Sequence, residues 1–145
     1  MNQRLLPSGH SDIAITQSHM ALYLLRIGRA SETLEQATSA EESLTKTLGA
    51  GHWRTAWARS LRGAALTALS RYAEAEPLVL QAYDRLRKNT GASRTQIDLA
   101  RNHVEHLYTA WGRASDASRY KNSLTVAAVA SAQQSAEVPP TDQSK

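Results

Sequence analysis

Apolar and small residues recur at spacings of three and four along most of the chain, most clearly between residues 61 and 86. Before Ser70 the series is Leu61, Ala64, Ala65, Ala68 and Leu69, and after it Ala75, Leu78, Val79, Ala82 and Leu86. This spacing places one apolar stripe on each of two helices, separated by a turn at residues 70–72. Small residues such as Gly63 would let the two backbones approach closely. We therefore expect an antiparallel helix pair in which Ala75 and Ala82 are buried.

The same pattern repeats with a period of 42 residues. Gly28, Ser70 and Gly112 hold equivalent positions; each is followed by arginine, and an acidic residue lies three positions beyond that arginine. An ungapped period within about 20–50 residues is the signature of a repeat array. The chain is therefore predicted to be all-α, with three stacked antiparallel helix pairs that turn at these positions.

The predicted helices span residues 12–27, 31–48, 54–69, 73–89 and 95–111, and a sixth begins at an N-cap, Ser115, and ends between residues 124 and 130. Thr95 and Asp98 have the spacing of a capping box. Pro77 should lie near the start of its helix, because an interior proline costs about 3 kcal/mol.

The chain divides into three parts in this interpretation. Residues 1–11 are the remnant of a preceding repeat, because Gly9-His10 lies 42 residues before Gly51-His52, and the chain would then be a piece of a longer array. Residues 12–130 form the helical repeat domain. Residues 131–145 are polar and carry two prolines, so we expect a disordered tail.

One segment resembles a known repeat family. The turn and second helix of a tetratricopeptide repeat are similar to SRYAEAEPLVLQAY, and the 42-residue period and the linker LGAGHWRTA resemble the kinesin-light-chain-like variety. The resemblance covers residues 13–124, with departures at Arg62, Glu105 and Lys121. It implies an α-solenoid, a short right-handed superhelix in which the first helix of each repeat lines a concave groove.

The resemblance also implies a binding site. It aligns Ser18, Ser60 and Asn102 at a groove-facing position, where short polar side chains hydrogen-bond the backbone of an extended peptide. His106 lies one turn beyond Asn102. The implied function is a protein–protein interaction scaffold, and the candidate peptide-binding residues are Ser18, Arg59, Ser60, Arg62, Asn102 and His106.

Charge narrows the kind of partner. The net charge is +4, and it divides into −1 for residues 1–48, +4 for residues 49–91 and +1 for the rest. The basic middle repeat favours an acidic partner segment. The chain has no cysteine, no apolar run long enough to cross a membrane and no signal-peptide core, so we expect a cytoplasmic protein.

Other chemistries are less well supported. His103 and His106 could share a helix face, but a zinc site needs three or four ligands and the sequence offers no third. The glycine-rich segment 49–52 lacks the lysine and the preceding strand of a phosphate-binding loop, and no nucleophile with its base is evident. We therefore expect no enzyme activity, no catalytic residue, no metal and no cofactor.

Two readings of the basic residues stay open. Tryptophans at 53 and 57 lie near six basic residues, a composition also found in nucleic-acid binders: Arg54, Arg59, Arg62, Arg85, Arg87 and Lys88. We interpret them instead as solvated helix faces with indoles packed between repeats. Arg59 and Arg101 share a register position, where they either pack by their stems or recognise carboxylates.

The alternative function is regulatory. The segment LARNHVEHLYTAWGRASDASRYKNSL resembles the C-terminal end of repeat regions attached to bacterial serine/threonine protein kinases. The chain carries no kinase motif, so the catalytic domain would be absent from it. In either case the first helix, with Met20, Tyr23, Leu24 and Ile27, should expose apolar surface, which favours self-association or contact with upstream repeats.

Overall fold

The computed structural model describes residues 2–89 and 91–121, with side chains from Asp12 onward. Every regular element in these ranges is a helix: α1 (Asn2–Arg26), α2 (Ala30–Leu48), α3 (Trp53–Ala68), α4 (Tyr72–Arg87), α5 (Arg94–Ala110) and α6 (Ala114–Ser118). The all-α prediction is confirmed for this part of the chain. The predicted end of the sixth helix and the predicted tail lie outside the described residues.

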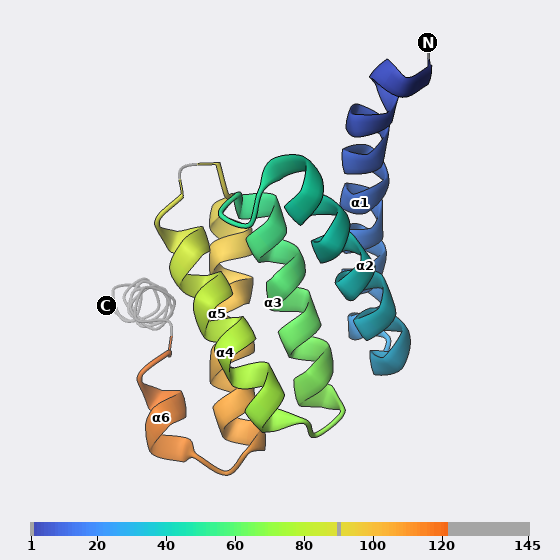
Figure 1. Ribbon diagram of the computed structural model, residues 1–145. Coiled ribbons are helices and arrows are strands. Elements are labelled where there is room, and N and C mark those ends of the chain that lie inside the picture. Colours follow the sequence, from blue (N-terminus) through green and yellow to red (C-terminus); the bar gives the residue numbers. More distant parts are fainter. Residues whose placement is uncertain (1, 90, 122–145) are drawn as a thin grey trace, which may run out of the picture.

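The helices form two layers, one of α1, α3 and α5 and the other of α2, α4 and α6 (Figure 1). Each helix packs against its neighbours in sequence, and α3 also contacts α1 and α5. Over the described ranges α1 and α5 do not contact each other, so α3 lies between them. None of the helices described has the length and hydropathy to span a bilayer.

The contact between α3 and α4 depends on small residues. A Cβ atom built on Gly63 would lie 2.5 Å from Cγ1 of Val79, so only glycine allows this approach without a shift. Ala75 and Ala82 are both 0 % exposed. The predicted close packing and the burial of both alanines are confirmed.

The three predicted turns are present and alike. Gly28, Ser70 and Gly112 adopt φ angles of 82°, 64° and 80°. In each turn the N–H of the following arginine donates to a carbonyl five residues earlier, at 2.8 Å, as in a helix C-cap closed by a left-handed residue. Ser70 is the non-glycine member, and its left-handed backbone is strained.

An arginine–acid pair follows each turn. Arg71 Nη2 lies 2.8 Å from Glu74 Oε1, Arg113 Nε lies 2.8 Å from Asp116 Oδ2, and Arg29 pairs with Glu32 in the same way. The hydrogen bond from Arg71 lowers the pKa of Glu74. Each acid lies in the first turn of α2, α4 or α6, where a negative charge compensates the helix dipole.

The first helix is longer than predicted. It begins at Asn2 instead of Asp12, so the predicted start of this helix is wrong. It continues through Gly9-His10, and that pair therefore forms no linker. Position 7 holds a proline where the register of the next repeat has Gly49, so the glycine that ends α2 has no counterpart there. Gly49 ends α2 with a φ of 94°, whereas the proline ring fixes φ near the helical value.

Two predicted caps are also wrong. The capping box of α5 is formed by Ser93 and Gln96, two residues before the predicted pair, because Ser93 is the last residue with extended backbone. Helix α6 begins at Ala114 with Arg113 at its N-cap, because the turn fixes that start. Pro77 is the sixth residue of α4 and is exposed, so water can satisfy the carbonyl that lacks a helix donor.

Candidate peptide-binding pocket

The three residues of the predicted polar ladder, Ser18, Ser60 and Asn102, are not all exposed in the structure. Ser18 is buried and its hydroxyl donates to the Ala14 carbonyl at 3.2 Å. Ser60 is 0 % exposed, and its Oγ lies 2.7 Å from Nδ1 of His103. Asn102 is exposed. Serine is small enough to fit at a helix contact, and the same size that suggested a groove position places two of the three inside the protein.

Arg59 and Arg62 bind the protein itself. Arg59 Nε lies 2.7 Å from Oε2 of Glu41, and Arg62 Nη1 lies 2.8 Å from Oε1. The side chains of Glu41 and Arg59 are only 10 % and 14 % exposed. Both guanidinium groups are therefore held across the contact between α2 and α3, and removal of Glu41 would leave their charge poorly compensated. Their role in binding an acidic partner stays a prediction, and both would have to share their charge with Glu41.

His103 and Trp57 form the contact between α3 and α5. Their rings are stacked with centroids 6.2 Å apart. Burial, and to a smaller extent the charge of His106, lowers the pKa of His103 to about 4. The imidazole is therefore neutral at pH 7. The Ser60–His103 pair has the distance of a nucleophile and its base, but the full burial of Ser60 denies a substrate access to the hydroxyl.

The two histidines of α5 do not act together. His103 faces Ser60, whereas His106 is exposed. Across the residues that the structure describes, no three His, Asp or Glu side chains gather as a metal site requires. Arg101, the register partner of Arg59, pairs with Asp98 at 3.1 Å, so it is also engaged within the protein.

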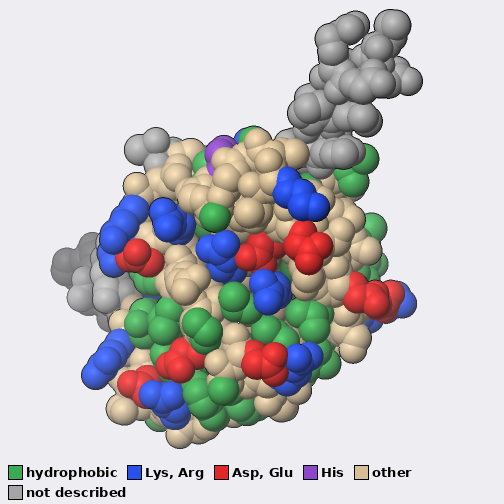
Figure 2. All heavy atoms as spheres, viewed as in Figure 1, with side chains coloured by type: hydrophobic (Ala, Val, Ile, Leu, Met, Phe, Trp, Pro, Cys, Tyr) green, Lys and Arg blue, Asp and Glu red, His purple; other side chains and the backbone are tan. Residues whose placement is uncertain are grey.

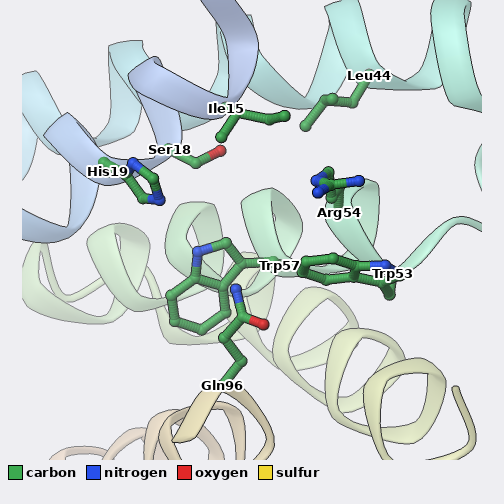
Figure 3. Close-up of a pocket in the computed structure, with 8 residues that line it drawn as sticks. All are labelled: Ile15, Ser18, His19, Leu44, Trp53, Arg54, Trp57 and Gln96. Atoms are coloured by element: carbon green, nitrogen blue, oxygen red, sulfur yellow. The ribbon is translucent and has the colours of Figure 1, made fainter. Parts of the chain in front are cut away.

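A pocket opens between α1, α3 and α5 (Figure 3). Its volume is about 190 Å³, and it is lined by Ile15, Ser18, His19, Leu44, Trp53, Arg54, Trp57 and Gln96. Figure 3 shows the indole of Trp57 between His19 of α1 and Gln96 of α5, with Arg54 beside Trp53. Of the six predicted site residues, Ser18 alone lines this pocket.

The pocket combines apolar walls with the guanidinium group of Arg54. Two indoles, Ile15 and Leu44 provide the walls. The Arg54 guanidinium lies 4.6 Å from the Trp53 ring centroid, and no acidic side chain pairs with it in the described ranges. Pockets for small molecules measure about 300–1,000 Å³. At about 190 Å³ this pocket suits one amino-acid side chain rather than a cofactor.

Helix ends add positive potential at the pocket. Trp53 and Arg54 are the first two residues of α3, and Gln96 is the third of α5. Neither helix has an acidic residue in its first turn. The partial positive charge of both N-termini is thus uncompensated by acids, and it favours an anion at the pocket mouth.

His52 supports this arrangement. Its Nδ1 accepts the Arg54 N–H at 3.0 Å and caps α3. Partial burial, and then the charge of Arg54, lowers the pKa of His52. The ring therefore stays neutral and able to accept at pH 7, and it leaves the Arg54 charge available.

The opposite layer offers less. Figure 2 shows Lys and Arg side chains next to Asp and Glu on the face made by α2, α4 and α6, with apolar side chains between them. A hollow of about 430 Å³ over α3 and α4 contains Arg59, Arg85 and Lys88. Arg59 and Lys88 are already paired, with Glu41 and Asp84. Arg85 is exposed and has no ion-pair partner among the described side chains, but the hollow lacks the tryptophan walls of the first pocket.

Sequence reasoning missed most of this pocket, although a signal was present. Arg54 and Gln96 lie 42 residues apart, so they hold one register position on successive first helices. The tryptophans were interpreted as packing residues, which holds for the buried Trp57. Glu41 gave no signal, because nothing in the sequence fixes how α2 rotates toward α3.

The comparisons with known proteins add no family: no protein-family model matches the chain, and no curated protein matches it. The functional argument therefore rests on the pocket, its charge and the repeat register.

Proposed function

We propose that this chain is a protein–protein interaction scaffold, a short right-handed solenoid of three tetratricopeptide-like helix pairs. It binds an extended acidic segment of a partner protein in the groove lined by α1, α3 and α5. The observation that carries the proposal is the pocket in that layer, with tryptophan walls and Arg54, which has no acidic partner among the described side chains. The lack of cysteine agrees with a cytoplasmic location, which we propose with the function.

The pocket suggests how the segment binds. One bulky apolar side chain enters against Ile15 and Trp53, which are half-buried, and its burial supplies most of the affinity. An adjacent carboxylate reaches Arg54 and the N-terminus of α3, which fixes the direction of the segment. The Gln96 amide offers a donor and an acceptor to the peptide backbone. Beyond the pocket, the exposed Asn102 and His106 of α5 continue the polar surface.

The test is selection from a random peptide library displayed on phage, with the full chain immobilised. The expected result is enrichment of peptides with an acidic residue next to a bulky apolar one. For one enriched peptide, Arg54→Glu should weaken binding about tenfold or more, because an attractive contact becomes repulsive. Gln96→Ala should weaken it less.

Arg119→Glu is the matched control. Arg119 is exposed at the end of α6, away from the pocket, and the substitution changes the net charge by the same amount. It should leave binding close to that of the unchanged chain. An equal loss in both variants would reduce the effect to overall charge, and a selection without an enriched motif would refute the proposal. Stronger binding of a single-stranded oligonucleotide, lost steeply with salt, would favour nucleic acid instead.

A further inference from the structure

The outward side of α1, continued by Ile27 directly after the helix ends, carries an apolar seam. Ile13, Met20, Tyr23 and Ile27 are between 46 % and 59 % exposed, and they are the large hydrophobic side chains exposed within the described ranges. The first, second and fourth lie seven residues apart, and Thr16 and Tyr23 fall between them at the fourth position of each heptad. This is the spacing of a two-helix coiled-coil seam. The expected exposure of Leu24 is wrong, because that side chain is buried toward the protein.

The register shows what such a face does elsewhere in the molecule. Met20 and Tyr23 correspond to Val104 and Leu107 of α5, 84 residues later, or two periods. Both α5 residues are 0 % exposed, because they pack with Val79 of α4. The equivalent face of α1 contacts no helix in the described part of the chain, since α1 packs against α2 and α3. This face is therefore suited to bind a helix.

Charge at the two ends of the seam identifies a suitable helix. Asp12 and Arg26 each precede a seam residue, Ile13 and Ile27, so both flank the same edge. Neither has an ion-pair partner among the described side chains. If two copies of α1 pair antiparallel, Asp12 of each faces Arg26 of the other, and opposite charges meet at both ends. A parallel pair would instead place Asp12 next to Gln17 of the second copy, so Asp12 would gain no opposite charge.

We propose that α1 joins two copies of this chain as an antiparallel pair about a two-fold axis. In this register Ile13 faces Tyr23 of the second copy, and Thr16 faces Met20. A two-fold contact uses the same face on both copies, so the assembly closes at two. Ile15 and Ser18 lie on another side of α1, but His19, which also lines the pocket, lies on the same edge of the seam as Asp12 and Arg26. The dimer would place His19 of the two copies together at the rim of the pocket. The two proposals therefore meet at this residue, and separate variants test them.

Sedimentation velocity and light scattering on the full chain, from micromolar to millimolar concentration, test the dimer. The expected mass is twice that of one chain and falls to one chain on dilution. Tyr23→Glu and Met20→Glu should each shift the chain to monomer, because a charge would enter the seam. Gln81→Glu, an exposed position on α4, is the control and should leave the dimer intact. Circular dichroism should show that all three variants keep their helices.

Charge-reversal variants test the antiparallel register. Asp12→Arg or Arg26→Asp alone should raise the dissociation constant about tenfold, since each creates two like-charge contacts per dimer. The two substitutions together should restore the constant of the unchanged chain. A chain that stays monomeric throughout overturns the proposal. A mass that keeps growing with concentration overturns the two-fold arrangement, and a double variant that stays weak overturns the antiparallel register.

Discussion

The two ends of the helix pairs are built from the same period and differ in charge. At one end lie the three turns at Gly28, Ser70 and Gly112, each followed by an arginine–acid pair. At the other end lie the linkers before α3 and α5, where neither helix begins with an acid and Arg54 has no acidic partner among the described side chains. Figure 1 shows the turns and the linkers at opposite ends of the layers.

The difference separates structure from recognition. At the turn end every helix dipole is matched by its own carboxylate, so little field is left for a partner. At the linker end the dipoles and one guanidinium point to a pocket without compensation from an acid. A repeat can therefore carry both roles, provided that the neutralising acids occur at one end of each helix pair and not at the other.

The largest expected effect comes from a substitution that should unfold the turn end and the linker end together. Ala82 is fully buried in α4, between the turn and the linker. Ala82→Glu places an unpaired charge in that core, at a cost of several kcal/mol, about 3–5, and should unfold the domain. Thermal unfolding followed by circular dichroism measures this.

Gln81→Glu provides the control, because its neighbouring position on α4 is exposed. It should leave the melting temperature nearly unchanged. If Ala82→Glu melted like the control, the helix register described above would be contradicted. If Ala82→Glu unfolded the turn end and left the linker end folded, the two ends would not share a core.

A second prediction concerns how the free energy of unfolding depends on pH, since His103 and Glu74, an acid at a turn, titrate in different pH ranges. Between pH 6.5 and about 4 the unfolded chain holds a proton on His103 that the folded protein does not, because burial lowers the pKa of His103 to about 4. The free energy of unfolding should therefore fall as pH drops through this window, by up to about 3 kcal/mol. Urea unfolding at each pH, followed by the fluorescence of the tryptophans, gives the measurement.

His103→Asn is the informative variant, since it can accept a bond from Ser60 but does not titrate. It should flatten the dependence above pH 4.5, although His52, whose pKa is also lowered, leaves a smaller slope. At the turn end Glu74 has a lowered pKa, so its contribution is lost only at more acidic pH. Equal slopes for both proteins would show that the pKa of His103 is not lowered in the folded protein.

The smallest effect concerns the turns alone. Ser70→Gly removes the strain of a left-handed serine and should stabilise the chain by about 0.5–1 kcal/mol, after the entropy that glycine adds to the unfolded state. Gly112→Ala, at the equivalent turn, should destabilise it by about 1 kcal/mol. Urea unfolding resolves both. Peptide binding should stay constant in both variants, and a change in affinity would contradict the separation of the two ends.

Much of the fold follows from local signals in the sequence. The turns were predictable because a left-handed residue, an arginine and an acid recur every 42 residues, and Ala75 and Ala82 because their size and spacing define a close helix contact. The site was less predictable. The pairing of Glu41 with Arg59 depends on how two helices rotate about their axes, and no short-range pattern encodes that rotation.

The prediction that Ser60 faces an open groove was also wrong, because its side chain is buried. A small polar residue on an apolar helix face satisfies the requirements of a groove and those of a helix contact equally well. Its partner His103, 43 residues away, decides between them. Such a choice depends on long-range contacts, which are set only after the helices have packed.

The arrangement of neighbours has a consequence for how the molecule opens. Helix α3 contacts α1, α2, α4 and α5, whereas α1 contacts α2 and α3. Opening α1 therefore breaks contacts with two helices, and opening α3 breaks contacts with four. Within the described residues, helix α6 contacts α5 alone. Its backbone amides should exchange with solvent hydrogen first, and those of α3 last, close to the limit set by global unfolding. Helix α3, in the middle of the chain, is therefore the element on which cooperative unfolding depends.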